Sequence, residues 1–337
     1  MEPLLQVRDL SVEFETDNGK VQAIDQVSFN VNPGETVCIV GESGSGKSVA
    51  SMSILRLLEF ENGSISSGEI LYQGDDLLKK SSEEMRQIRG KDISIIFQEP
   101  MTALNPVFTI GKQLTEAILL HQELSKKKAW DRAKELLDLV GINDVAVRMK
   151  QYPHELSGGM RQRVMIAIAL SCDPKLLIAD EPTTALDVTI EAQILNLLNE
   201  LKEKINMSVI FITHDMGVAA EISDRIVVMY AGKVVEEGNV YEVFDQPTHP
   251  YTKGLLQSIP TEDGPRQKKL ASIRGTIPSI NQMPSGCRFH PRCDYATEKC
   301  LKVEPQLERF NGRSVACLNY EDVIKEEPLT RRKEGMI

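Results

Sequence analysis

Cysteine, tryptophan and aromatic residues in general are scarce in this chain. Its 337 residues include six cysteines and one tryptophan, and aromatic residues make up 5%. Long apolar runs are also lacking, because the longest, Val164–Leu170, falls far short of the roughly 20 residues that cross a bilayer. The N-terminus has no basic segment followed by an apolar one, so we expect no secretory signal. These absences predict an intracellular chain in which cysteines stay reduced.

The charge balance excludes another class of protein. The formal net charge is −10, with 41% hydrophobic and 26% charged residues. Such a composition is typical of a globular protein with a sizeable core. A negative balance argues against non-specific binding of nucleic acid, and we predict no nucleic-acid partner.

The pattern of apolar residues predicts an α/β fold. Continuous apolar runs at 36–40, 93–97, 176–180 and 208–215 are typical of parallel strands buried on both faces. Alternating patterns at 4–14, 21–31 and 68–74 predict antiparallel strands, and 225–238 predicts a hairpin with a tight Ala-Gly turn. The fold class is therefore a parallel-sheet core with an antiparallel β subdomain.

Two changes of pattern suggest how the chain is divided. From 109 to 142 apolar residues recur at helical spacing, which predicts a helical subdomain at about 105–162. After about residue 245 prolines become dense, which marks a boundary. We predict a large domain over 1–255 and a small, loop-rich C-terminal domain over 256–337.

The stretch GESGSGKS at 41–48 has the spacing of a phosphate-binding loop and lies between an apolar strand and a helical pattern. Its glycines let backbone N–H groups surround phosphate oxygens at the positive end of a helix. Lys47 is expected to reach the β- and γ-phosphates, and the Ser48 hydroxyl to bind Mg²⁺. The alternative is a flexible turn with a solvated lysine. The candidate ATP-binding residues are Gly41, Ser43, Gly44, Ser45, Gly46, Lys47 and Ser48.

A second apolar strand, LLIADEP at 176–182, ends in two acids. Asp180 is expected to hold Mg²⁺, and Glu181 is the candidate general base for the attacking water. Taken alone, this pattern also fits an ordinary strand that ends in two solvated acids. Its pairing with a phosphate loop favours the catalytic interpretation.

Between these two motifs lies LSGGMRQR at 156–163, and TALD and ITHD follow at 184–187 and 212–215. This ordered set resembles the ATP-binding-cassette (ABC) ATPases over about the first 240 residues. The resemblance implies that Ser157, Gly158 and Gly159 of one subunit cap the γ-phosphate of ATP on another. A dimer of ATPase subunits follows. Ser157 alone would suit a simple helix N-cap.

The resemblance also implies roles for four further residues. Gln98, in FQEP, would sense Mg²⁺ and the attacking water, and His214 would contact the γ-phosphate. Asp187 would communicate across the dimer. Phe14 aligns with the aromatic residue that stacks on adenine, although a core phenylalanine would fit the same alternating strand.

Three further stretches narrow the resemblance to the ATPase subunits of dipeptide and oligopeptide importers, in particular the D-type member. They are FQEPMTALNP, PTHPYTKGLL and SGCRFHPRC, starting at 97, 247 and 285. The implied partners are a second ATPase subunit (heterodimer or homodimer), two transmembrane permeases and an extracytoplasmic peptide-binding protein. The implied location is peripheral, on the cytoplasmic face of the membrane. Alternatives are an importer of nickel or another small solute, a soluble ABC ATPase of DNA repair or translation, and an exporter.

Four cysteines gather near the C-terminus: Cys287, Cys293, Cys300 and Cys317. They are separated by five, six and sixteen residues, without the C-x₂₋₄-C spacing usual for zinc. Four thiolates suit a [4Fe–4S] cluster, which some members of the resembled family carry. Arg288 and Arg292 lie next to the first two cysteines in sequence and are expected to favour thiolates. We predict this cluster; zinc and reduced structural thiols are the alternatives.

Overall fold

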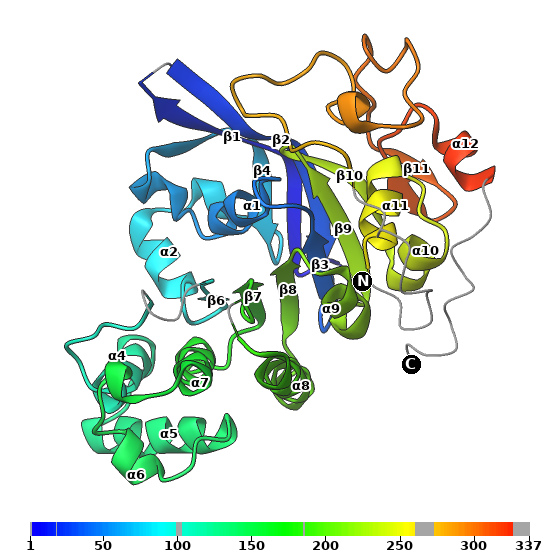
Figure 1. Cartoon of the computed structure of the whole chain (residues 1–337). Helices are drawn as coiled ribbons and strands as arrows, with labels where there is room; N and C mark the ends of the chain where they lie inside the picture. Colours follow the sequence, from blue (N-terminus) through cyan, green and yellow to red (C-terminus); the bar gives the residue numbers. More distant parts are fainter. Residues whose placement is uncertain (1, 18, 99–102, 185, 260–272, 326–337) are drawn as a thin grey trace. The chain divides into compact units, whose positions relative to one another are not determined.

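A computed structural model of the chain describes residues 2–17, 19–98, 103–184, 186–259 and 273–325 (Figure 1). These residues belong to two compact units. The helical unit comprises residues 31–35 and 77–212, and the strand-rich unit comprises 2–30, 36–76 and the residues from 213 onward. Each unit is described by itself.

Parallel strands form the centre of the helical unit. β6 (Ile93–Ile96) pairs with β7 (Leu176–Asp180), and β7 pairs with β8 (Ser208–Thr213). Every residue of β7 and β8 is buried, which is why their sequences are continuously apolar rather than alternating. The structure therefore confirms these predicted strands.

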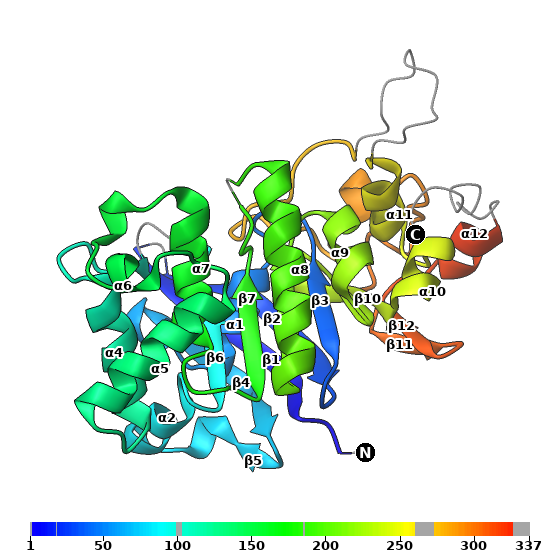
Figure 2. The ribbon, with the colours of Figure 1, turned by 90° about the horizontal axis from the view of Figure 1, so that it is seen from below.

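Helices supply the rest of this unit, and most of them lie on the side of β6 (Figure 2). Leu114, Leu136 and Leu137 of the predicted helical subdomain are fully buried where its helices meet, and its bounds at about 105–162 stay a prediction. Helix α7 also packs against β6. The bounds are α2 (Ser82–Ile88), α4 (Ile110–His121), α5 (Lys126–Leu139), α6 (Val145–Arg148), α7 (Gly158–Ala169) and α8 (Val188–Ile205).

The strand-rich unit contains a four-stranded sheet in the order β2-β1-β4-β5. Its strands are β1 (Leu5–Thr16), β2 (Gly19–Val31), β4 (Gly63–Tyr72) and β5 (Asp75–Asp76). β4 begins at Gly63, earlier than the alternating pattern at 68–74 predicts. Its serine-rich start is held in the sheet by antiparallel pairing with β1, where Phe14 lies opposite Gly63.

The other strands of this unit follow the order β11-β12-β10-β9-β3. β3 (Thr36–Val40) is parallel to β9 (Arg225–Tyr230), and β9 turns back into β10 (Lys233–Asn239). Ala231 (φ 46°) and Gly232 (φ 81°) form the tight turn that the sequence predicts. The C-terminal segment, residues 273–325, adds β11 (Glu308–Phe310) and β12 (Arg313–Val315), and β12 pairs with β10.

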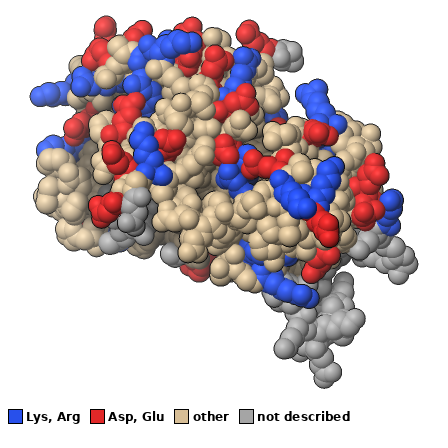
Figure 3. All heavy atoms as spheres, turned by 90° about the horizontal axis from the view of Figure 1, so that it is seen from above, with Lys and Arg blue, Asp and Glu red and all other residues tan. Residues whose placement is uncertain are grey.

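The strand-rich unit also contains α-helices. They are α1 (Lys47–Ile54), α9 (Met216–Ile222), α10 (Val240–Asp245), α11 (Pro250–Gln257) and α12 (Tyr320–Lys325). None of the helices that the structure describes is long and apolar enough to cross a membrane. Lys and Arg side chains lie among Asp and Glu side chains over the face that Figure 3 shows, so both signs of charge are mixed there. The domain boundary at 255/256 stays a prediction.

Candidate nucleotide site and the cysteine-bearing segment

The phosphate loop joins β3 to α1 in the strand-rich unit. Gly41, Gly44 and Gly46 have φ angles of 155°, 81° and 101°, values that L side chains rarely adopt. A Cβ on Gly46 would lie 2.7 Å from Ile24 Cγ2, whereas a Cβ on Gly44 would meet nothing within 4 Å. The loop is therefore packed against β2 at one glycine and open at the other.

Loop residues that carry side chains also have defined positions. The Lys47 ammonium donates hydrogen bonds to the carbonyls of Gly41 (2.7 Å) and Glu42 (3.1 Å). Ser45 is fully buried, while Ser43 is exposed and Ser48 is half-buried. Since Gly46 caps α1 without a side chain, the first N–H groups of this helix face the loop.

Two further predicted residues lie in the same unit. Phe14, near the end of β1, is half-buried, and a Cβ on Gly63 would lie 3.0 Å from its ring. The stacking of Phe14 on adenine stays a prediction. His214 is exposed and directly follows β8.

The acidic motif lies in the helical unit. Asp180, the last residue of β7, is 6% exposed. Glu181 follows with φ 44°, a strained conformation for a residue other than glycine. One oxygen of its carboxylate, Oε2, accepts hydrogen bonds from Gln98 Nε2 (2.8 Å) and Thr184 Oγ1 (3.0 Å). The structure thus brings together two of the residues predicted to act in catalysis.

Two helix starts in this unit carry the remaining predicted residues. Ser157 caps α7, with its hydroxyl accepting from the Met160 N–H at 3.4 Å, and Gly158 and Gly159 form the first turn. Asp187 caps α8 by accepting from the Ile190 N–H at 3.0 Å. Residues 99–102, in the FQEPMTALNP stretch, and residue 185, in TALD, lie outside the described residues.

The chemistry of these groups fits a nucleotide with its metal ion. The open space at Gly44 and the N-terminus of α1 suit phosphate oxygens, because backbone N–H groups there can face an anion. The Ser48 hydroxyl in the strand-rich unit, and the Gln98 amide oxygen and the Asp180 carboxylate in the helical unit, each offer the kind of hard oxygen that Mg²⁺ prefers.

The cysteine-bearing segment does not fit the predicted iron–sulfur cluster. In the described part of the chain, which includes Cys287, Cys293, Cys300 and Cys317, no group of three or more His, Cys, Asp or Glu side chains is arranged to hold a metal ion. All four are free cysteines. The prediction of a [4Fe–4S] cluster is therefore wrong for this structure, and zinc lacks support for the same reason.

The electrostatic argument for thiolates also fails. Burial raises the pKa of the Cys287, Cys293 and Cys317 thiols, to about 11 at Cys293 and about 12 at Cys317. The guanidinium groups of Arg288 and Arg292 instead pair with Asp25 and Glu42. The remaining alternative is that of reduced structural thiols.

Hydrogen bonds hold the segment around these thiols. The Asn319 amide Nδ2 donates to Cys300 Sγ (3.3 Å) and to the Tyr295 carbonyl (2.8 Å), and the Asn319 N–H donates to Cys317 Sγ (3.4 Å). Asn319 has no local sequence signal that predicts this position. The same holds for Tyr251, whose hydroxyl oxygen accepts from the Glu42 N–H at 2.8 Å.

Comparisons with known proteins agree with this geometry. The ABC transporter family model matches residues 24–184, and the model of the oligopeptide/dipeptide transporter C-terminal region matches residues 235–300. The chain is 52% identical to the oligopeptide transport ATP-binding protein AppD of Bacillus subtilis, over 97% of this chain and 100% of that protein. It is 51% identical to OppD of the same organism, over 96% of this chain and 91% of that protein.

Solved structures resemble the chain less closely. The ATP-binding cassette MJ0796, in a dimeric post-hydrolysis state bound to ADP and Pi, is 28% identical with a TM-score of 0.63, covering 70% of this chain and 98% of that one. CbiO1 of Clostridium perfringens, part of the transporter complex cbiONQ, is also 28% identical, with a TM-score of 0.61, covering 72% and 91%. The predicted fold class is confirmed. The chain belongs to the family of ATP-binding proteins of oligopeptide ABC transporters.

Proposed function

We propose that this chain is the ATP-hydrolysing subunit that powers uptake of dipeptides and oligopeptides through a membrane ABC importer. The observation that carries this proposal is the phosphate loop, whose glycines adopt conformations that open its backbone toward an anion at the start of α1. The match of residues 235–300 to a peptide-transporter C-terminal region supports the substrate class over the exporter and the soluble ATPase.

In this proposal the loop residues bind the ATP phosphates and Phe14 stacks on adenine. Lys47 would leave its present carbonyl partners for the β- and γ-phosphates, a short move for a flexible ammonium. Mg²⁺ would be held by Ser48, Asp180 and Gln98, and it would neutralise phosphate charge during transfer to water.

Glu181 is proposed as the general base that takes a proton from the attacking water. Gln98 Nε2 fixes one oxygen of its carboxylate at 2.8 Å, which orients the base. The strained backbone of Glu181 is maintained by the bond from its N–H to the Ile212 carbonyl at 3.0 Å. His214 would contact the γ-phosphate and help to position the water.

The site is proposed to close with a second ATPase subunit. Ser157, Gly158 and Gly159 of one subunit would cap the γ-phosphate on its partner, and Asp187 would contact the partner's site. The N-terminus of α7 supports this role, since a helix start with two glycines exposes N–H groups to an anion. Both a heterodimer and a homodimer satisfy this arrangement.

Two permease subunits and an extracytoplasmic peptide-binding protein complete the proposed importer. Attachment to the cytoplasmic face of the membrane would come through the permeases. Exposed apolar side chains lie next to Gln98 and in the predicted helical subdomain. They support such a contact, because apolar side chains are costly to leave in water. They include Phe97 (41% exposed), Val107 (70%) and Leu120 (74%).

Glu181→Gln tests the catalytic role in the assembled complex. We expect ATP binding to persist while ATP turnover falls by about two orders of magnitude or more, as loss of a general base requires. Glu200→Gln, a change of the same type at an exposed position of α8, is the matched control and should turn over ATP normally. Normal turnover by Glu181→Gln would contradict the assignment of the base.

The substrate class has its own test. In reconstituted vesicles, the binding protein loaded with an oligopeptide should stimulate ATP hydrolysis, whereas the same protein supplied with Ni²⁺ should not. Stimulation by Ni²⁺ alone would favour the small-solute alternative.

A further inference from the structure

The segment 287–293 reaches the phosphate loop through its two arginines. Arg288 and Arg292 each pair with a carboxylate far away in sequence, at Asp25 and Glu42. Glu42 is the second residue of the phosphate loop itself. All these residues belong to the strand-rich unit.

The contact between Arg292 and Glu42 is bidentate. Arg292 Nη1 lies 2.7 Å from Glu42 Oε2, and Nη2 lies 3.0 Å from Oε1. The arginine side chain is 5% exposed and the glutamate side chain 34%. Arg292 is itself fixed, since its Nε donates to the Arg274 carbonyl at 2.7 Å and its guanidinium lies 5.6 Å from the centre of the Tyr230 ring. A planar guanidinium held in this way gives the carboxylate one orientation.

Glu42 is held at its backbone as well. Its N–H donates to Tyr251 Oη at 2.8 Å, and its carbonyl accepts from Lys47 Nζ at 3.1 Å and from the Ser45 N–H at 3.2 Å. One residue therefore links the C-terminal segment to the lysine that is proposed to bind phosphate. Loss of the Arg292 side chain would therefore free the Glu42 carboxylate and loosen the phosphate loop.

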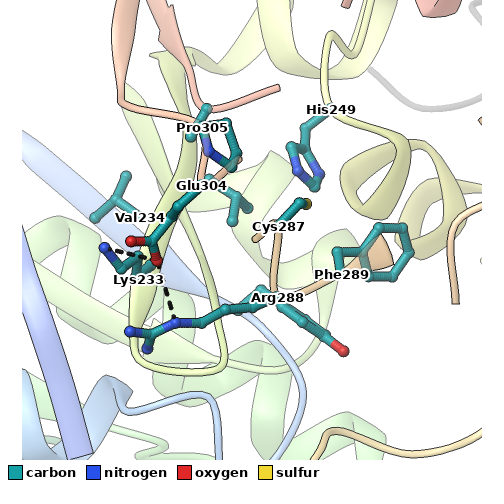
Figure 4. A pocket seen from close by; sticks show the side chains of 11 residues that line it. Lys233, Val234, His249, Cys287, Arg288, Phe289, Glu304 and Pro305 are labelled. Atoms are coloured by element: carbon teal, nitrogen blue, oxygen red, sulfur yellow. Dashed lines mark ion pairs between the residues drawn. The ribbon is translucent and has the colours of Figure 1, made fainter. Parts of the chain in front are cut away.

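Arg288 reaches the other side of the loop through the turn between β9 and β10. Its Nη1 donates to the Ala231 carbonyl at 2.7 Å, and the next residue, Gly232, donates its N–H to the Ser45 carbonyl at 2.9 Å. Figure 4 shows Glu304 between Arg288 and Lys233, with distances of 3.5 Å and 3.0 Å to their nitrogens. Arg288 is thus fixed by Asp25 and Glu304, and it stabilises the turn at Ala231 and Gly232.

We propose that Arg292 and Arg288 are positioning residues for the phosphate loop, so that the C-terminal segment sets the affinity of the site for ATP. Arg292 acts directly on Glu42, and Arg288 acts through the turn at Ala231 and Gly232. This inference rests on the proposed ATP-binding role of the loop. The loop contacts phosphates before and during hydrolysis, so loosening it weakens binding and leaves the chemical step unchanged.

Calorimetric titration of the full-length chain with Mg-ATP tests the inference, because it yields the dissociation constant and the number of sites separately. We expect Arg292→Gln and Glu42→Gln each to raise the dissociation constant roughly tenfold with an unchanged number of sites. The double variant should bind ATP no more weakly than either single variant, because each single change already breaks the ion pair between Arg292 and Glu42. Arg292→Lys keeps the positive charge but cannot form the bidentate contact, so its dissociation constant should lie between those of wild type and Arg292→Gln. Arg288→Gln should weaken binding as well.

The matched control is Arg309→Gln, an arginine of the same unit whose side chain is exposed and which has no part in holding the loop. It should bind ATP as wild type does. Wild-type affinity in both Arg292→Gln and Glu42→Gln would overturn the inference, and so would fewer sites with an unchanged dissociation constant, the result of partial unfolding. A wild-type chain that fails to bind ATP would overturn the proposed function together with the inference.

Discussion

His249 makes the stability of the strand-rich unit depend on pH. Its side chain is 1% exposed and caps α11, with Nδ1 accepting from the Tyr251 N–H at 3.1 Å. Burial lowers the pKa of His249 from 6.5 to about 3, so the ring is neutral in the folded state at pH 5 while it is protonated in the unfolded chain. Stability from this group is therefore complete above pH 6.5 and is lost as pH falls toward 3.

The magnitude follows from linkage. A pH of 5.0 lies about 1.5 pH units below the pKa of the histidine in the unfolded chain. Protonation of the unfolded chain therefore lowers the free energy of unfolding by about 2 kcal/mol between pH 7.5 and pH 5.0. His249→Asn removes the titration and keeps a side-chain oxygen that can cap α11. We therefore expect the stability advantage of wild type over His249→Asn to shrink by about 2 kcal/mol between the two pH values.

Urea denaturation followed by circular dichroism at pH 7.5 and pH 5.0 measures this difference. Buried Glu236, which accepts from the His249 N–H at 2.9 Å and whose pKa is raised by burial, is present in both proteins, so its own titration cancels. His154→Asn, at an exposed histidine, is the control and should show the pH dependence of wild type. Equal pH dependence in wild type and His249→Asn would refute the reasoning.

Three glycine substitutions test the packing, two in the strand-rich unit and one in the helical unit. Gly46→Ala should weaken ATP binding at least tenfold, because its Cβ would lie 2.7 Å from Ile24 Cγ2, and Gly44→Ala, which has open space, should weaken it less in the same titration. Equal losses would contradict the role of that clash. Gly111→Ala should destabilise the helical unit by about 1–3 kcal/mol in urea, since its Cβ would lie 2.7 Å from the Trp130 ring. The fluorescence of Trp130 monitors this unfolding, and an unchanged midpoint would argue against the clash.

Much of the fold could be predicted because its signals are local. β3, β7 and β8 are buried on both faces, so their sequences are continuous apolar runs. The turn at Ala231 and Gly232 needs positive φ angles, which Gly-containing pairs favour. The phosphate loop is recognisable for the same reason, since its glycines and lysine lie within eight consecutive positions, 41–48.

Contacts between distant residues could not be predicted in this way. Gln98 and Glu181 are 83 positions apart and meet only because β6 and β7 are neighbours in the sheet. Arg292 and Glu42 are 250 positions apart, and no local pattern identifies a partner at that separation. The cysteine prediction failed for a related reason, because Arg292 is adjacent to Cys293 in sequence whereas its guanidinium pairs with Glu42 in the structure.

The pairing of β12 with β10 has a consequence for the behaviour of the chain in solution. Without the C-terminal segment, β10 would present unpaired N–H and C=O groups along one side, and such an open edge can recruit a strand from another molecule. β12 covers part of it, and β11 then becomes the outermost strand with only three residues. Two of them, Glu308 and Arg309, are charged and exposed, which discourages further strand addition. We therefore expect the chain to aggregate more readily when β11 and β12 are removed.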